Sequence, residues 1–257
     1  MTTSKYIVLG GGMVAGYAAK ELVSRGLGPG ELLIISADDA LPYERPPLSK
    51  GLLAGKETEA GILINNADWY RQHGIGVQLQ TMIEDVDLQK NQLRAAGGDT
   101  FAFETLLIAT GARPRRLDCP GNDLPNVFYL RSMDDSRKIR ENAESCKRAV
   151  IVGGGFIGME VAAVLAQKNI ETTLIIKEDR VWSRVFTPPM SDFFERYYIS
   201  RGVQLIKRGS VVGLEGKDRV TAAVLSSGRT IPCDMVVAGV GATPVSRSRS
   251  GRACCPP

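Results

Sequence analysis

Two glycine-rich segments of the chain have the spacing that lets a backbone approach a phosphate group. In the first segment, Gly10, Gly12 and Ala15 follow the pattern G-x-G-x-x-[G/A]. The first glycine of this pattern permits a tight turn, the second lets a pyrophosphate approach the backbone, and the small third residue keeps a helix close to a sheet. Exposed N–H groups and the helix dipole then attract the phosphates. The same spacing also occurs in turns that bind nothing, so this motif by itself is a weak signal.

The second segment is a complete G-x-G-x-x-G motif, formed by Gly153, Gly155 and Gly158. Glu160 follows it on the same predicted helix. Glu178 comes after the next predicted strand, at a spacing where an acid can accept hydrogen bonds from a ribose hydroxyl group. Two such motifs in one chain predict two dinucleotide-binding sites.

An acidic residue also follows the strand after the first motif. Asp38 could accept hydrogen bonds from a ribose hydroxyl group, or it could be a solvated loop acid beside Asp39. In the second site, Glu178 would repel a 2′-phosphate and therefore favours NADH over NADPH. Lys177 next to it weakens this inference.

A stiff loop lies between the two motifs. Residues 42–50 read Pro-Tyr-Glu-Arg-Pro-Pro-Leu-Ser-Lys, and the prolines with a bulky aromatic residue make the segment too rigid for a linker. The loop would present Arg45 and Lys50 together. Taken alone, it could equally be a solvated basic segment without a ligand.

The elements that must position these residues form two strand–helix–strand units. Each unit places its glycine turn between an apolar strand and a helix, which leads to a second strand of a parallel sheet. Later landmarks repeat in the same order, so the halves are predicted to be structural duplicates. The predicted elements are strands 6–9, 32–35, 149–152 and 172–176, helices ending near 25 and 168, repeated Gly-Val-Gln-Leu segments at 76–79 and 202–205, and closing strands 106–109 and 235–238.

The bulk composition limits the class of protein. The chain has 257 residues, 44% of them hydrophobic, and a net charge of +4 from 32 basic and 28 acidic residues. This balance gives no argument for a nucleic-acid or membrane surface. The cysteines lack CxxC spacing, so neither a metal site nor a redox dithiol is suggested. The first strand begins too close to Met1 for a signal peptide, and we expect a cytoplasmic protein.

Other conspicuous side chains are interpreted as structural. His73, at a predicted helix end, favours a surface or capping role. Trp182 and the aromatic residues within 193–198 favour packing over substrate stacking.

The motifs together resemble the FAD- and pyridine-nucleotide-dependent reductases. The resemblance rests on both glycine motifs, the Tyr-Glu-Arg-Pro-Pro-Leu-Ser-Lys loop, Ala-Thr-Gly-Ala-Arg-Pro and Gly-Val-Gly-Ala-Thr-Pro in one order, over residues 5–245. It implies an α/β fold with two Rossmann-like dinucleotide-binding domains. The first is an incomplete FAD-binding domain at 1–115, and the second is an NAD-binding domain at 116–242 that is inserted into it. Residues 243–257 are predicted to form an aberrant, disordered tail, because the end of the chain has no apolar periodicity.

The same resemblance assigns individual residues to the two cofactors. Lys50 would stabilise the negative charge that accumulates on the flavin ring during reduction, which makes it the expected catalytic residue. Arg45 would pair with the FAD pyrophosphate. The residues assigned to FAD are Gly10, Gly11, Gly12, Met13, Ala15, Gly16, Asp38, Arg45, Lys50, Ile83 and Arg131. Those assigned to NADH are Gly153, Gly154, Gly155, Phe156, Ile157, Gly158, Glu160, Glu178, Arg184 and Gly241.

Within the family the sequence looks most like monodehydroascorbate reductases, through Arg-Val-Phe-Thr-Pro at 184–188 and Tyr-Leu-Arg at 129–131. This similarity implies hydride transfer from NADH to FAD, with NADPH less favoured. Single electrons would then pass to the monodehydroascorbate radical, which regenerates ascorbate. A reductase of a ferredoxin or rubredoxin partner is the alternative enzyme. No cysteine pair follows the first helix, so a dithiol mechanism is not expected.

The resemblance ends at Ser246, where a segment rich in Ser, Arg and Cys replaces the chain with which family members return to the flavin domain. We therefore expect a truncated chain whose own activity is open, and a non-catalytic product is a further alternative. The second unit holds all its predicted strands, whereas the first lacks its last members. NADH binding is thus expected to outlast FAD binding. The residues concerned are Gly155, Gly158 and Glu178 for NADH, and Gly12, Asp38 and Lys50 for FAD.

Overall fold

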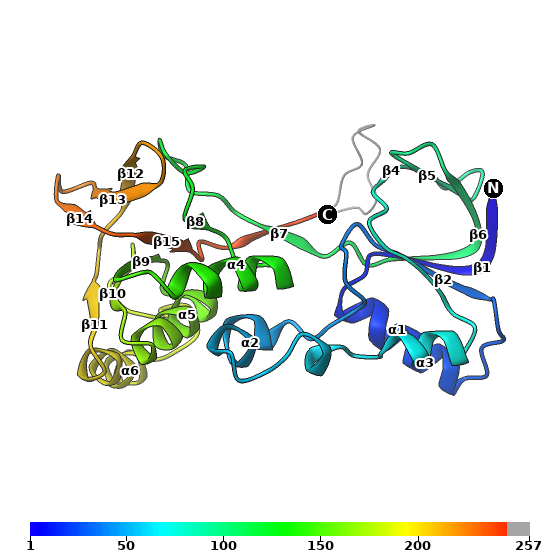
Figure 1. Ribbon diagram of the computed structural model, residues 1–257, viewed down its shortest axis with the longest axis horizontal. Helices are drawn as coiled ribbons and strands as arrows, with labels where there is room; N and C mark the ends of the chain where they lie inside the picture. The colour runs from blue at the N-terminus through cyan, green and yellow to red at the C-terminus, as the bar shows by residue number, and fades with distance from the viewer. Residues whose placement is uncertain (246–257) are drawn as a thin grey trace. The chain divides into compact units, whose positions relative to one another are not determined.

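The computed structural model describes residues 1–245, and the tail expected at 246–257 lies outside the described residues. The chain divides into two compact units. Unit 1 consists of Met1–Arg45, Glu59–Arg113 and the chain from Pro244, and unit 2 consists of Pro46–Thr58 and Pro114–Thr243. Each unit has its own main sheet and its own helices (Figure 1).

A six-stranded sheet forms the centre of unit 1, in the order β3-β2-β1-β6-β5-β4. Strands β3, β2, β1 and β6 are parallel, whereas β5 and β4 continue the sheet in antiparallel pairing. Parallel neighbours need crossover connections, and α1 supplies the one between β1 and β2. The strands are β1 (Thr2–Leu9), β2 (Leu32–Ile35), β3 (Gly76–Gln78), β4 (Ile83–Asp87), β5 (Gln92–Ala95) and β6 (Thr100–Ile108).

Both faces of this sheet are covered, because successive apolar residues of a strand point to opposite sides. One face packs against α1 (Met13–Ser24) and α3 (Ala67–Gln72), which the short 3-10 helix η2 (Ala60–Ile62) precedes. The core cluster on this face contains Val8, Ala15, Ala19, Leu32, Ile34, Tyr70 and Ile75. The cluster on the other face contains Ile7, Leu33, Ile35, Leu93, Ala95, Phe101 and Phe103.

Unit 2 is built on a five-stranded sheet in the order β11-β10-β9-β15-β8, in which every pair is parallel. A separate antiparallel sheet has the order β12-β13-β14. Val150 of the first sheet and Ala223 of the second belong to one core cluster. The strands are β8 (Val127–Phe128), β9 (Arg148–Val152), β10 (Glu171–Ile175), β11 (Val203–Ile206), β12 (Val211–Gly216), β13 (Val220–Leu225), β14 (Thr230–Pro232) and β15 (Met235–Ala238).

Three longer helices belong to unit 2: α4 (Met133–Ala143), α5 (Phe156–Gln167) and α6 (Pro188–Ser200). Helix α4 begins with a capping box, in which Ser132 and Asp135 each accept a hydrogen bond from the other's backbone N–H. Helix α6 begins with prolines, which suit the first turn because its N–H groups have no partner within the helix.

The proline-rich loop is divided between the units: it belongs to unit 1 up to Arg45 and to unit 2 from Pro46, although the sequence analysis placed all of it in the first domain. Its short helices η1 (Pro46–Ser49) and α2 (Gly51–Ala54) pack against α4 and α5. Ser136 Oγ in α4 donates a hydrogen bond to Leu48 O at 2.8 Å. This contact joins residues far apart in sequence, which is why local patterns did not indicate it.

The two units repeat one sheet topology. The order β3-β2-β1-β6 of unit 1 corresponds to β11-β10-β9-β15 of unit 2. In unit 1 a glycine turn follows β1 and leads into α1, and in unit 2 the corresponding turn follows β9 and leads into α5. The predicted α/β fold with two Rossmann-like units is therefore confirmed.

The end of the described chain is held by strand pairing. Strand β16 (Ala242–Pro244) pairs with β7 (Ala112–Pro114), so residues 243–244 are not part of a disordered tail. Beyond β16, the Val245 N–H donates to Gly111 O at 2.9 Å and Thr110 Oγ1 donates to Val245 O at 2.7 Å. The apolar-periodicity argument missed this strand because its stabilising partners are backbone groups.

Within residues 1–245, no helix is long and apolar enough to cross a membrane. The same part of the chain contains no group of three His, Cys, Asp or Glu side chains that could hold a metal ion. Its three cysteines, Cys119, Cys146 and Cys233, are free thiols.

Candidate functional site

The first glycine motif forms the turn between β1 and α1. Gly10 has φ = +122°, and a Cβ atom there would lie 2.2 Å from the Ala109 carbonyl oxygen, so a side chain does not fit. Gly12 is the N-cap of α1, and a Cβ atom there would lie 3.6 Å from Nη2 of Arg45. A guanidinium group thus stands beside the open N-terminus of the helix. This cradle fits a pyrophosphate group.

Asp38 lies just beyond β2, with its carboxylate half-buried and held on both oxygens. Tyr43 Oη donates to Oδ2 at 3.0 Å, and the Asp39 N–H donates to Oδ1 at 2.9 Å. Burial raises the pKa of Asp38 above 3.8, and the hydrogen bond from Tyr43 opposes that shift. Tyr43 is only 2% exposed. The sequence analysis did not assign this tyrosine, and its place in the stiff loop was the available signal.

The other residues assigned to FAD are divided between the units. Ile83 begins β4, and the backbone shortly before it runs beside the end of β2, where the Gln80 N–H donates to Asp38 O at 3.0 Å. Lys50 and Arg131 belong to unit 2 instead. The assigned residues that unit 1 holds are Gly10, Gly11, Gly12, Met13, Ala15, Gly16, Asp38, Arg45 and Ile83.

The second glycine motif forms the corresponding turn between β9 and α5. Gly153 has φ = +113°, and a Cβ atom there would lie 2.4 Å from Gly239 O. At Gly158 the added atom would lie 1.9 Å from Gly153 O, so this glycine lets α5 pack against the turn. At Gly155, the N-cap of α5, no atom of the described residues lies within 4 Å of an added Cβ. The turn is therefore open where a phosphate would meet the helix N-terminus.

A cleft of about 540 Å³ opens over this turn in unit 2. Its walls contain most of the residues that the sequence analysis assigned to NADH. Ile157, Gly158 and Glu160 are not among them. The assigned residues that line the cleft are Gly153, Gly154, Gly155, Phe156, Glu178, Arg184 and Gly241.

Cationic side chains beyond those assigned to NADH also line this cleft. They are Lys177, which the sequence analysis weighed beside Glu178, and Arg180, Arg115 and Arg116, which it missed. Arg115 and Arg116 come from the segment after β7. The proximity of Arg115 and Arg116 to the glycine turn depends on the fold, so sequence spacing could not indicate it. Cations outnumber acids on these walls, which suits the phosphates of a dinucleotide.

Trp182 both packs and lines the cleft. Its ring centroid lies 5.7 Å from that of Phe156 and 4.9 Å from that of Phe194, as the packing interpretation predicts. The backbone φ of Trp182, +49°, is rare for a bulky residue, and its backbone N–H donates to Gly154 O at 3.1 Å. Trp182 Nε1 and Arg180 Nε are buried without a hydrogen-bond partner within residues 1–245.

Glu160 is bound by the proline-rich loop rather than by the cleft. Its Oε2 accepts hydrogen bonds from Ser49 Oγ at 2.5 Å and from Lys50 Nζ at 2.8 Å. Ser49 is buried, whereas 53% of the Lys50 side chain is exposed. Burial and the negative charge of Glu160 raise the pKa of Tyr198, which places this phenol near the cluster. The ion pair fixes the lysine ammonium at the start of α2.

Residues 4–254 match the family model of the pyridine nucleotide-disulphide oxidoreductases. The chain belongs to this family. The match covers both glycine turns, the proline-rich loop and the strands around them. FAD and a nicotinamide dinucleotide are the cofactors that this family implies, and the N-termini of α1 and α5 have the open backbone that phosphate groups need.

Several curated relatives are monodehydroascorbate reductases of plants. The peroxisomal enzyme 1 of rice (Oryza sativa subsp. japonica) is 41% identical over 256 residues, which cover 93% of this chain and 53% of the relative. The seedling isozyme of cucumber (Cucumis sativus) is 38% identical over 267 residues, covering 97% of this chain and 62% of the relative. The chain thus spans about half to three-fifths of the length of these relatives.

Solved structures of electron-transfer reductases have the same fold. Putidaredoxin reductase, in its covalent complex with putidaredoxin, matches with a TM-score of 0.91 and 30% identity, over 97% of this chain and 61% of that one. A ferredoxin reductase from Rhodopseudomonas palustris matches with a TM-score of 0.86 and 33% identity, over 94% of this chain and 59% of that one.

Proposed function

We propose that this chain provides the two nucleotide sites of an FAD-dependent reductase that takes hydride from NADH and passes single electrons to monodehydroascorbate. The observation that carries the proposal is the pair of glycine turns, each open at a helix N-terminus and each followed by an acid beyond the next strand. The names of relatives that are 41% and 40% identical support the choice of acceptor.

The residues of unit 1 are assigned to FAD. The N–H groups at the start of α1 and the guanidinium of Arg45 would neutralise the pyrophosphate. The carboxylate of Asp38, held by Tyr43, would accept hydrogen bonds from a ribose hydroxyl group. Bound FAD supplies the chemistry, because a flavin accepts two electrons as a hydride and releases them one at a time.

The cleft of unit 2 is assigned to NADH. Gly155 leaves room for the pyrophosphate at the start of α5, and Arg184 and Arg180 supply positive charge on the walls. Glu178 would accept hydrogen bonds from the adenosine ribose and repel a 2′-phosphate, which favours NADH. Lys177 beside it reduces that preference.

Lys50 is the proposed catalytic residue. Its ammonium group is held by Glu160 at 2.8 Å, and Ser49 fixes the same carboxylate oxygen. A fixed cation stabilises negative charge that develops during a reaction, because it needs little reorganisation at that moment. We assign to Lys50 the stabilisation of the charge that accumulates on the flavin ring on reduction.

An anaerobic stopped-flow experiment tests the acceptor. The protein is first loaded with FAD and reduced with NADH. It is then mixed with enzymatically generated ascorbate radical in one experiment and with an oxidised ferredoxin in a second. Recovery of the oxidised flavin spectrum at a faster rate with the radical is the expected result. Recovery with the ferredoxin alone would replace the proposal by the alternative below.

A protein acceptor of the ferredoxin type is the second candidate. The specific observation that favours it is the fold match to putidaredoxin reductase, solved with putidaredoxin bound, at a TM-score of 0.91. Cytochrome c reduction that depends on added ferredoxin would support this candidate.

We place the protein in the cytoplasm. The free thiols of Cys119, Cys146 and Cys233 suit a reducing compartment of this kind. Relatives from rice and Arabidopsis thaliana carry peroxisomal names, so peroxisomes are the competing compartment. Fractionation of cells that express the tagged protein would separate the two, and recovery with a peroxisomal marker would contradict the cytoplasmic assignment.

A further inference from the structure

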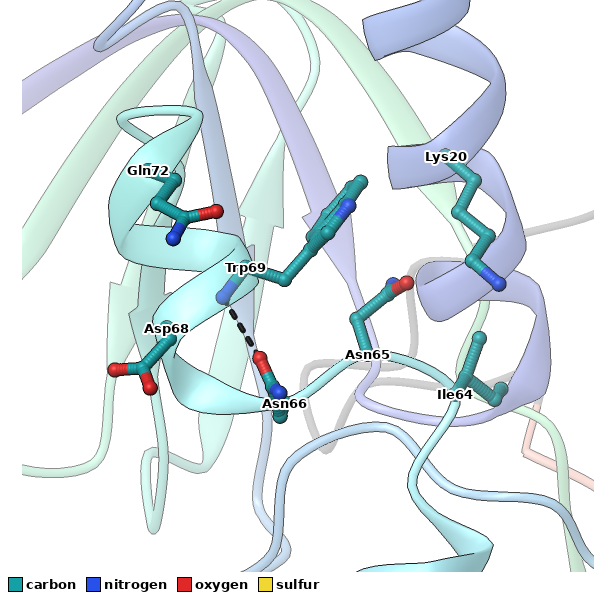
Figure 2. Close-up of a pocket in the computed structure, with 7 residues that line it drawn as sticks. All are labelled: Lys20, Ile64, Asn65, Asn66, Asp68, Trp69 and Gln72. Carbon is teal, nitrogen blue, oxygen red and sulfur yellow. Dashed lines mark hydrogen bonds between the residues drawn. The ribbon is translucent and has the colours of Figure 1, made fainter.

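A pocket of about 560 Å³ lies on unit 1, away from the glycine turn, between α1 and the segment that leads into α3. Figure 2 shows its lining side chains, with Lys20 on α1 and Trp69 on α3 on either side of Asn65. Neither the fold family nor the proposed nucleotide sites account for these side chains. The pocket combines a flat aromatic ring, a carboxamide and an ammonium group.

Asn65 is a fixed hydrogen-bond acceptor at the base of this pocket. The residue is 5% exposed, and its Nδ2 donates to Gly16 O at 3.2 Å and to Tyr70 Oη at 3.3 Å. These two bonds satisfy the amide group and fix the orientation of the side chain. Oδ1 accepts no hydrogen bond within residues 1–245 and is not a buried atom, so it faces the pocket. A buried amide oriented in this way offers its acceptor without a reorganisation cost.

Trp69 supplies a rigid apolar wall. Its backbone N–H donates to Asn66 Oδ1 at 2.8 Å, which anchors the first turn of α3. The indole centroid lies 5.3 Å from that of Tyr70 and 4.4 Å from that of His73, so the ring is packed from behind. The residue lines the pocket, and its Nε1–H is not buried and has no hydrogen-bond partner within residues 1–245. Aromatic faces of this kind pack against the C–H groups of sugars while the ring edge donates a hydrogen bond.

The charge open to a ligand in this pocket is positive. Asp68 at the rim is paired with Arg71 at 3.0 Å. Lys20, in contrast, forms no ion pair within the described residues, and its ammonium contacts the ring of Tyr17 at 5.8 Å from the centroid. A carboxylate on a ligand would therefore gain an unshared cation.

We propose that this pocket binds a small polyhydroxylated carboxylate, the chemistry of a sugar acid. The carboxylate lies at Lys20, a hydroxyl group donates to Asn65 Oδ1, and a face of C–H groups covers the indole of Trp69. The site is distinct from both glycine turns, so binding there would be a property additional to the proposed electron transfer. A ligand of this size with so few contacts is expected to have a Kd on the order of 1 mM.

The indole N–H resonances of the wild-type protein test this proposal. The chain has two tryptophans, so its ¹⁵N–¹H spectrum contains two indole signals, which a Trp69→Phe variant assigns. Titration with D-glucuronate is expected to shift the Trp69 signal saturably and leave the Trp182 signal in place. D-glucose tests the hydroxyl groups without the charge, and acetate tests the charge without the sugar. We expect glucose to bind at least tenfold more weakly and acetate to cause no shift.

A charge variant separates the site from non-specific binding. Lys20→Gln removes an exposed cation that forms no ion pair within the described residues, so the fold should persist, and glucuronate affinity should fall about tenfold while glucose affinity is unchanged. Lys90→Gln is the matched control, because this lysine is also exposed in the same unit and lies on the turn between β4 and β5. The proposal is overturned if no shift occurs, if acetate shifts the signal equally, or if both variants behave like the wild type.

Discussion

At the scale of single residues, Tyr43 is the addition that the structure makes to the predicted FAD site. Its hydroxyl donates to Asp38 Oδ2 at 3.0 Å and opposes the rise that burial causes in the pKa of that carboxyl group. A ribose hydroxyl group needs the ionised form as acceptor. The tyrosine therefore keeps Asp38 charged and oriented at once.

Tyr43→Phe should weaken FAD binding about fivefold, the effect of one hydrogen bond to a charged acceptor. Because the variant loses a group that lowers the pKa of Asp38, affinity should also begin to fall at a higher pH as the solution is acidified. Flavin fluorescence titrations between pH 5 and 8 measure both effects. Tyr17→Phe is the control, since its hydroxyl bonds Glu44 instead. An unchanged pH midpoint for Tyr43→Phe would contradict this role.

The proposed role of Lys50 makes a kinetic prediction. Lys50→Gln shortens the side chain by one atom and removes the charge held by Glu160. Loss of one fixed stabilising group should slow flavin reduction by NADH on the order of 100-fold while FAD still binds. Lys56→Gln, just beyond α2, should have no effect on that rate. Equal rates of reduction for both variants in a stopped-flow trace would remove Lys50 from the mechanism.

The thiols of Cys146 and Cys233 should be inert at neutral pH. Burial raises the pKa of Cys146 to about 11 and that of Cys233 to about 12. The native state therefore keeps protons that the unfolded chain releases above 9.0, and unfolding free energy should fall as pH rises past that value. Site-resolved mass spectrometry after iodoacetamide treatment at pH 8 should find both thiols unmodified until denaturant is added. Rapid native alkylation of either one would refute the assigned burial.

At the scale of elements, the last two glycines of the second motif, Gly155 and Gly158, have separable roles. A methyl group at Gly158 would clash with Gly153 O at 1.9 Å, whereas one at Gly155 would meet open space in the cleft. Gly158 is thus required for the packing of α5, and Gly155 for the approach of a ligand.

Gly158→Ala should therefore cost about 1–3 kcal/mol of unfolding free energy, as overpacking does. Gly155→Ala should leave Tm unchanged within a degree or so but reduce NADH affinity, because its methyl group would occupy the place of the phosphate. Thermal unfolding and calorimetric titration measure the two quantities on the same samples. A Gly155→Ala protein that binds NADH normally would show that the cleft is not the nucleotide site.

Elements marked by local apolar patterns could be predicted from the sequence. Strands β2 and β15 have the predicted bounds, Leu32–Ile35 and Met235–Ala238. Strand β1 begins at Thr2 rather than at residue 6, because its first residues pair with Phe101–Phe103 of β6. Such pairing gives no periodic signal in a polar segment. The same reason explains why the cations at 115 and 116 were missed, since the glycine turn that they approach is distant in sequence.

At the scale of the whole molecule, the repeated sheet topology accounts for the two proposed nucleotide sites. Each unit repeats one parallel strand order, and each places a glycine turn at the carboxyl end of an inner strand. Ligands of open α/β sheets bind at such ends. The units then differ in their additions: unit 1 extends its sheet with β5 and β4, and unit 2 adds β8 and a separate sheet. The repeat predicts two nucleotides, and the differences allow them to be different nucleotides.

The most direct test of this account is the visible spectrum of the protein, loaded with FAD, during anaerobic addition of NADH. The two-site assignment predicts that the oxidised flavin bands disappear in proportion to the NADH added, and that Gly155→Ala requires a much higher NADH concentration for the same bleaching. A protein that holds a full complement of FAD, yet keeps its oxidised spectrum at saturating NADH, would contradict the claim that these two sites form a hydride-transfer pair.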